Sequence, residues 1–355
     1  MAYSTINKST DYFNTVTYTG SAGGQTISGV GHQPDFIWVK QRGDAGYDHS
    51  LHNSVSGLLK QLISNSTAAE ITNTDTVTSN NADGFVLGDD TAGPSANSNN
   101  QNGKNYVAWN WKANGQGSSN TDGSINTTYT SVNTTAGFSI SKYTGTGASA
   151  TIGHGLGVAP NVIITKQLTG TTQWNVQSSM MGYSQYMSLN TTDASQATGG
   201  ALISSVSNTT YSCDGNSAIN AGSGSTYIAY CFAEKTGYSK FGTYTGNANA
   251  DGPFIYTGFK PAFVITKRTD TSGGHWVIND NKRNNQTPLT NPSNDWLYAG
   301  GNNEEYDATN YPMDLLSNGF KIRHTGGYQN TANNYLYMAF GQTLVGSNNI
   351  PATAR

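Results

Sequence analysis

The chain has 355 residues, a formal net charge of −3 and only 11% charged residues. This weak charge excludes strong steering toward nucleic acid or an anionic membrane surface, and the length predicts two or three domains. The 42 glycines and 21 tyrosines favour an all-β fold, because glycine permits tight turns and aromatic side chains suit a half-buried sheet.

The chain begins with a short polar segment, residues 1–11, that we predict to be an N-terminal arm. The segment lacks the apolar region of a secretory signal. No apolar run anywhere in the chain reaches the length of a membrane span. We therefore expect a protein that is made in the cytoplasm and is not inserted into a membrane.

Three motifs recur three times in the same order, which predicts that one ancestral domain was triplicated. Tyr-Thr-Gly occurs at residues 18–20, 143–145 and 244–246. Gly-x-x-Pro leads through an apolar run to a lysine, at Lys40, Lys166 and Lys267. Tyr-x-Ala-aromatic occurs at residues 106–109, 227–230 and 337–340. We expect the three lysines to share one structural position, and the aromatic residues Trp109, Tyr230 and Phe340 to share another.

The repeats predict three tandem antiparallel β-sandwich domains of a jelly-roll-like kind. Their predicted bounds are residues 12–112, 129–238 and 239–355, the last including a C-terminal tail. Residues 113–128 are rich in Gly, Ser and Asn and predict a linker. Because the second join, near 236–238, is short, we expect domains two and three to pack closely. Domain one should be attached more loosely, as one bead of a string.

The apolar run before each repeated lysine is typical of a buried strand. Asp-Gly-Phe at 83–85 and Asn-Gly-Phe at 318–320 predict turns that lead into strands. The second copy lacks this Gly-Phe, and residues 211–213 are expected to replace it. Residues 55–63 are the only segment that suggests one or two turns of helix.

Six residues are candidates for contacts with a ligand or partner. Lys40, Lys166 and Lys267 either form a contact repeated three times or, the favoured interpretation, keep strand ends in water. The other three candidates are Trp174, Trp276 and Trp296, which lie among polar residues outside the core-like motifs. Aromatic side chains in such surroundings suit a binding surface. The first two recur, which favours burial in the core, and His49 occupies the corresponding place in the first copy.

No catalytic, metal-binding or cofactor-binding constellation is predicted. His49 and His52 would be an incomplete metal site. The acidic pairs Asp89-Asp90 and Glu304-Glu305 could serve a weak Ca²⁺ site or a glycosidase, but neither recurs, and solvated loops are favoured. We therefore expect no enzyme activity, no cofactor and no bound metal.

The two cysteines, Cys213 and Cys231, both lie in the second copy. Cys231 is expected to be a small buried apolar group. A disulfide between the two requires neighbouring strands, and a cytoplasmic origin disfavours it.

Residues 13–40 and 106–112, together with the ending from Ala339 to Arg355, resemble a family of uncharacterised structural proteins of tailed bacteriophages, many from marine and cyanobacterial viruses. Residues 154–166 are similar to motifs in phage tail-fibre and lectin-like jelly-roll domains. The first copy departs from the family pattern, since His32 stands where the third copy has Phe259. The resemblance implies a virion protein with β-sandwich domains.

We therefore expect a virion surface protein that is made in the cytoplasm of a host bacterium and contacts other virion proteins. The first hypothesis is a tail-associated fibre or receptor-binding component that adheres to host surface glycans, with repeated domains raising avidity. The second is a capsid decoration protein, in which three similar domains mimic a trimer at a three-fold position and residues 1–11 dock on the shell. A glycan depolymerase is the third.

Overall fold

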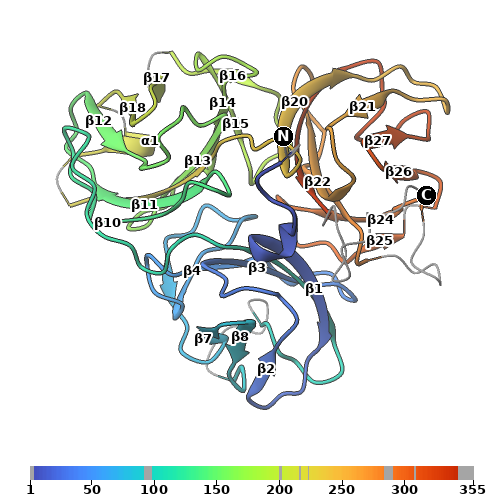
Figure 1. The fold of residues 1–355 in the computed structure, drawn as a ribbon, viewed down its shortest axis with the longest axis horizontal. Coiled ribbons are helices and arrows are strands. Elements are labelled where there is room, and N and C mark those ends of the chain that lie inside the picture. Colours follow the sequence, from blue (N-terminus) through green and yellow to red (C-terminus); the bar gives the residue numbers. More distant parts are fainter. Residues whose placement is uncertain are drawn as a thin grey trace.

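The computed structural model describes residues 4–91, 98–199, 202–215, 217–222, 224–283, 291–307 and 309–342. Within these residues the paired strands are antiparallel, which confirms the predicted all-β fold class. Figure 1 shows three units of sheet arranged as a triangle around a common centre. Residues 1–3 of the predicted arm and residues 343–355 of the predicted tail lie outside the described part of the chain.

Each unit contains one larger sheet, and its four central strands follow the same order in all three units. The first unit has β1 (Phe13–Thr19), β9 (Asn105–Trp111), β3 (Phe36–Gln41) and β4 (Ser50–Asn53). The second has β11 (Phe138–Thr144), β19 (Thr226–Phe232), β13 (Val162–Gln167) and β14 (Asn175–Ser178). The third has β20 (Ser239–Thr245), β28 (Asn334–Gly341), β22 (Pro261–Arg268) and β23 (Val277–Asp280).

Additional strands extend two of these larger sheets. In the second unit β10 (Tyr129–Asn133) lies outside β11, and β15 (Gln185–Ser188) and β16 (Gln196–Ala197) lie beyond β14. In the third unit β24 (Asp295–Tyr298) and β25 (Tyr306–Asp307) lie beyond β23. The short elements outside the sandwiches are η1 (Ser9–Asp11), the pair β5 (Lys60–Gln61) and β6 (Ile71–Thr72), and α1 (Ser217–Asn220).

A smaller three-stranded sheet completes each sandwich, again in one repeated order. These sheets are β2 (Gln25–Ile27), β8 (Gly84–Leu87) and β7 (Val77–Asn81); β12 (Ala150–Gly153), β18 (Thr210–Cys213) and β17 (Ile203–Val206); and β21 (Phe254–Tyr256), β27 (Gly319–Ile322) and β26 (Met313–Leu316). The repeated order is what a common ancestral domain predicts, and the triplication itself stays a prediction.

The predicted turns before Phe85 and Phe320 are confirmed, since Gly84 begins β8 and Gly319 begins β27. A Cβ atom at either glycine would collide with a carbonyl oxygen of the adjoining edge strand. In the second sandwich Tyr211 takes the place of the phenylalanine, because it pairs with Ile152 as Phe320 pairs with Ile255.

The predicted helical fragment at residues 55–63 is wrong. The segment forms turns that lead into β5. Gly57 has a φ of +94°, in the left-handed region that a right-handed helix cannot use. The amide of Leu62 also bonds to the carbonyl of Leu51 at 2.9 Å, so backbone pairing between strands replaces bonding within a helix.

The central strands are continuously apolar because both of their faces are buried. In β3, Ile37 and Val39 face the smaller sheet of their own sandwich, where they pack in one core cluster. Phe36 and Trp38 face the opposite way and belong to a second cluster that contains residues of all three sandwiches. The larger sheet of each sandwich therefore separates a local core from a shared one.

The shared core joins all three sandwiches at the centre of the triangle in Figure 1. Ring centroids lie 4.6 Å apart between Phe36 and Tyr230, 5.9 Å apart between Phe232 and Phe340, and 5.2 Å apart between Phe13 and Phe340. Each of these contacts crosses a different boundary between sandwiches. The expected string of beads with a loosely attached first domain is therefore wrong.

The pairing register confirms one of the predicted equivalences and corrects the other. Lys40, Lys166 and Lys267 share one position, opposite Val107, Ile228 and Leu336. Stacked tyrosine pairs align the closing strands at Tyr18–Tyr106, Tyr143–Tyr227 and Tyr244–Tyr335. In the third copy Met338, not Phe340, thus occupies the place of Trp109 and Tyr230. The motif match was shifted by two residues because Tyr335 and Tyr337 both fit its first position.

Candidate functional site

The residues predicted to contact a ligand or partner are almost completely buried. Lys40, Lys166, Lys267 and Trp174 are 0% exposed, Trp296 is 1% exposed and Trp276 is 2% exposed. Five of the six lie at the boundaries between sandwiches, which we call the seams. The seams therefore contain most of the residues that the sequence predicted to contact a ligand or partner.

Equivalent side chains donate a hydrogen bond across each seam. The indole Nε1 of Trp174 donates to the carbonyl of Ile63 in the first sandwich, and that of Trp276 donates to the carbonyl of Ser188 in the second, both at 2.9 Å. Each tryptophan directly precedes the fourth strand of its larger sheet. These two side chains thus join the second sandwich to the first and the third to the second.

His49 occupies the same place in the first sandwich, as predicted, and closes the circle. Its Nε2 lies 2.9 Å from the carbonyl oxygen of Tyr298 in the third sandwich. Trp38 donates its indole N–H to Nδ1 of His49 at 2.8 Å, so Nδ1 is the acceptor and Nε2 carries the proton. Burial holds the pKa of His49 well below its usual range, so the ring stays neutral.

A second set of backbone hydrogen bonds repeats the same cyclic pattern. Glu70 N–H donates to Leu168 O at 2.9 Å, Ser195 N–H to Thr269 O at 2.7 Å, and Glu305 N–H to Arg42 O at 2.7 Å. Each acceptor lies two residues after a repeated lysine. The first sandwich therefore bonds to the second, the second to the third, and the third back to the first, in a closed ring with approximate three-fold symmetry.

The repeated lysines lie beneath these bonds and are not solvated strand ends, so the interpretation we favoured from sequence is wrong. Nζ of Lys166 donates to Thr67 O at 3.1 Å and Nζ of Lys267 to Asp193 O at 2.6 Å, each in the preceding sandwich. Nζ of Lys40 donates to Gln41 O at 2.6 Å. Burial lowers the pKa of all three lysines to about 8, because the covering sandwich removes water from the ammonium groups.

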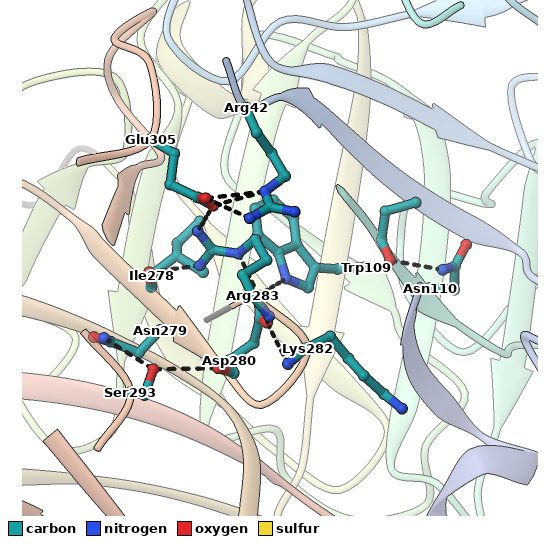
Figure 2. A network of polar contacts seen from close by, with 11 residues as sticks. Arg42, Trp109, Asn110, Ile278, Asn279, Asp280, Lys282, Arg283, Ser293 and Glu305 are labelled. Atoms are coloured by element: carbon teal, nitrogen blue, oxygen red, sulfur yellow. Dashed lines mark hydrogen bonds and ion pairs between the residues drawn. The ribbon is translucent and has the colours of Figure 1, made fainter. Parts of the chain in front are cut away.

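The seam between the first and third sandwiches differs from the other two because it contains a buried ionic network (Figure 2). Arg283, which is fully buried, contacts Asp280 through Nε and Glu305 through Nη1, both at 2.7 Å. Glu305 also pairs with Arg42 of the first sandwich at 2.6 Å. The guanidinium carbon of Arg283 lies 5.5 Å from the ring centroid of Trp109, within reach of a cation–π interaction.

Charge pairing dominates the ionisation of this network. Burial alone would lower the pKa of Arg283, but the charges of Asp280 and Glu305 outweigh it and raise the pKa above its ordinary value.

The chain itself also crosses the other two seams, through residues 113–128 and 233–238. No such direct connection joins the first sandwich to the third, so this seam is closed by packing, hydrogen bonds and ion pairs.

Sequence reasoning missed this network. Glu305 was predicted only as half of an acidic pair in a solvated loop, and Arg283 was not a candidate residue. A useful signal was that ionisable residues are scarce in a chain with 11% charged residues, yet Asp280, Lys282 and Arg283 lie within four positions. Their partners on the first sandwich are too distant in sequence to be recognised from spacing.

Trp296 is separate from the seams and lies in an aromatic cluster of the third sandwich. Its ring centroid is 5.2 Å from Tyr311, 5.9 Å from His324 and 6.4 Å from Tyr328. Its indole N–H has no hydrogen-bond partner within the described ranges. Tyr306, paired with Trp296 on β25, is 47% exposed. The predicted tryptophan surface is therefore divided between two seams and this cluster.

Two of the remaining polar candidates, Asp90 and His52, form hydrogen bonds within the first sandwich. Asp90 accepts hydrogen bonds from the side chain of Ser98 and, at 2.8 Å each, from the amides of Asn99 and Asn100. His52 bonds to the carbonyl of Leu58 at 2.7 Å. Among the residues that the structure describes, no three His, Cys, Asp or Glu side chains form a candidate metal site.

Cys213 and Cys231 are both buried free thiols. They lie on different sheets of the second sandwich and pack in its local core. Burial raises the pKa of each thiol to about 12, which disfavours the reactive thiolate.

Comparison with known proteins identifies a family but no characterised relative. Residues 8–343 match the family described as domain of unknown function (DUF7483), and the chain belongs to that family. No curated protein and no solved structure gives a significant match. None of the helices in the described ranges has the length and apolar character needed to cross a membrane.

Proposed function

We propose that this DUF7483 family member is a structural protein of a bacteriophage particle and that its closed ring sits on a three-fold position of the particle surface. The supporting observation is the cyclic pattern of seam bonds. His49, Trp174 and Trp276 each bond to the neighbouring sandwich through the same geometry. The residues that recur along the chain thus serve assembly of the ring, as expected of a structural protein.

A ring of three similar sandwiches presents three similar surfaces. A partner with three-fold symmetry can contact all three at once, and each further contact forms at a high effective concentration. A capsid decoration protein placed over a three-fold or quasi-three-fold position meets this description. A single chain that mimics a trimer has the additional property that one of its sandwiches can carry features that the others lack.

The second candidate, a tail-associated fibre or receptor-binding component, is supported by the third sandwich. This sandwich carries the aromatic cluster around Trp296, and it exposes Tyr306, Phe254 and Tyr256. Aromatic faces beside amide side chains suit the binding of surface glycans. This candidate differs from the first in copy number and in its need for a host ligand.

Quantitative mass spectrometry of purified particles distinguishes the two candidates. Tens to hundreds of copies per particle, measured against the major capsid protein, are expected for a decoration protein. A small number, in multiples of three or six, would instead support the tail component. Absence from purified particles would contradict both.

A further inference from the structure

The outer edge of the third sandwich carries two exposed aromatic residues on β21, a strand that pairs with β27 on one side only in the described structure. β21 is the terminal strand of its sheet in the described structure. Phe254 is 45% exposed and Tyr256 is 59% exposed, whereas Ile255 between them faces the local core. We propose that this edge binds an extended segment of a neighbouring protein, which adds to the sheet as a further strand parallel to β21. The proposal does not depend on where the protein sits on a particle.

The second sandwich shows the same edge in a filled state. Its equivalent strand, β12, is bordered by residues of the 113–128 segment, and Ile125 forms a parallel bridge with Ile152. The amide of Ile125 donates to the carbonyl of Thr151 at 3.0 Å. The amide of Thr151 donates to Oγ of Ser124 at 2.9 Å. An extended segment therefore binds at this position of this fold.

The backbone of β21 is oriented to make the same bonds. Ile322 N–H donates to Pro253 O at 3.1 Å and Thr257 N–H donates to Asn318 O at 3.0 Å. In an antiparallel pair, bonded and non-bonded residues alternate, so the amide and carbonyl of Phe254 point away from β27. Phe254 corresponds to Thr151, because Ile255 and Ile152 pair with equivalent aromatic residues. The free edge thus offers the donor and acceptor that Thr151 uses.

Within the described ranges, no segment of the chain lies along the outer edge of β21 as residues 123–125 lie along β12. Only residues 233–238 lie between β19 and β20, compared with the longer segment that precedes β10 in the second sandwich. An edge strand with large apolar side chains is a site where another chain can pair. In the first sandwich the equivalent positions hold small polar residues, Thr26 on β2 and Ser28 directly after it.

The flanking side chains indicate the chemistry of the partner segment. A strand added in the register of Ile125 places one aliphatic residue beside Ile255 and places its neighbours beside Phe254 and Tyr256. Aromatic residues pair well with β-branched residues on adjacent strands. Gly123, two residues before Ile125, approaches β12 so closely that a Cβ atom would collide with Thr151 O. The expected partner segment therefore has a glycine followed by alternating β-branched and aliphatic residues.

A peptide titration tests the proposal on the full chain. The probe is acetyl-Gly-Val-Ile-Val-Thr-amide, which follows residues 123–127 with valine at the two positions beside the aromatic rings. With ¹⁵N-labelled protein, we expect saturable shifts of the Phe254, Ile255 and Tyr256 amide signals. The combined change Phe254→Thr and Tyr256→Ser, which copies β2, should weaken binding about tenfold. The same peptide with an N-methylated isoleucine should not bind, because it lacks the N–H that bonds to Phe254 O.

Matched measurements keep the result interpretable. Thr26→Ala on β2 should leave the titration unchanged, and an unchanged melting temperature should confirm that the double variant is folded. No saturable shift at residues 254–256 would overturn the proposal. Equal binding at β2 would overturn the role of the aromatic residues. Dimerisation of the free chain through β21, measured by sedimentation, would assign the edge to a second copy and also overturn it.

Discussion

The indole N–H of Trp109 in the first sandwich donates to Oδ2 of Asp280 in the third at 2.9 Å. The same carboxylate oxygen pairs with Arg283 at 2.7 Å, and Arg283 contacts Glu305, which in turn binds Arg42. One continuous polar network therefore begins and ends on the first sandwich. It stabilises the seam that the chain does not span directly, so changes in this network test how the ring is closed.

Replacing Glu305 by glutamine should destabilise the protein by about 3 kcal/mol, because loss of one partner leaves a buried arginine incompletely compensated. The glutamine has nearly the same shape and removes only the charge. Chemical denaturation monitored by tryptophan fluorescence measures the change. Glu304→Gln is the matched control, since Glu304 is exposed, and surface substitutions cost less than about 0.5 kcal/mol. Equal effects of the two substitutions would contradict a role of the network in closing the seam.

Trp276→Phe should cost about 1 kcal/mol, because the carbonyl of Ser188 would lose its 2.9 Å hydrogen bond and keep only the longer one from the amide of Thr191 at 3.4 Å. The phenyl ring retains much of the apolar contact. Trp296→Phe provides a control of the same chemistry, since the Trp296 indole is equally buried but donates to no described residue. We expect a smaller loss for Trp296→Phe in urea unfolding. A loss at Trp296 as large as that at Trp276 would show that ring volume, and not the seam hydrogen bond, determines the cost.

The buried lysines should make the folded state more stable as the pH rises from about 8. Their pKa is lowered from 10.5 to about 8 in the folded chain, so between these values the unfolded chain binds more protons. Stability then increases with pH. Below about pH 8 both states are protonated, and the cost of burying the charge is fully present. Above pH 10, ionisation of tyrosines in the unfolded chain opposes the trend, since burial raises the pKa of tyrosines such as Tyr238 in the folded chain.

Lys267→Met isolates the lysine contribution to this pH dependence. The free energy of unfolding of each protein is measured between pH 7 and pH 10 in the same buffer. We expect the difference between wild type and variant to shift in favour of the wild type as the pH rises through this interval. A difference that stays constant would mean that Lys267 titrates normally in the folded state.

The sequence contained most of what defines a single sandwich. The recurrent Tyr-Thr-Gly and apolar-run-to-lysine motifs identified equivalent strands, and their spacing placed His49 with Trp174 and Trp276. These features are local, since each depends on neighbours along one strand. The position of Met338 was missed because two tyrosines, two residues apart on the same face, fit one motif.

The closed ring could not be predicted from spacing, because its contacts join residues such as Trp109 and Asp280 that lie far apart in the chain. A signal was nevertheless present in the strands themselves. Phe36 to Val39 is apolar at every position, whereas a sandwich with one solvated face predicts alternation. Continuous apolar runs in all three copies required a second buried surface. The lysines that follow these runs were predicted to be solvated strand ends, because the sequence does not show that a neighbouring sandwich covers them; Lys166 and Lys267 donate to carbonyl groups of that neighbour.

A shared core also predicts that the three sandwiches unfold together. Phe340 packs against Phe13 of the first sandwich and Phe232 of the second, so unfolding one sandwich exposes apolar surface on the other two. Differential scanning calorimetry should show one transition, with a calorimetric enthalpy close to the van't Hoff enthalpy. Three independent beads would instead give separable transitions and a calorimetric enthalpy well above the van't Hoff value. The variant Phe340→Ala should lower the single transition temperature as a whole, because the cavity it creates, at a cost of about 3–5 kcal/mol, lies in the core that all three sandwiches share. Loss of only one part of the transition in this variant would show that the central contacts do not couple the sandwiches.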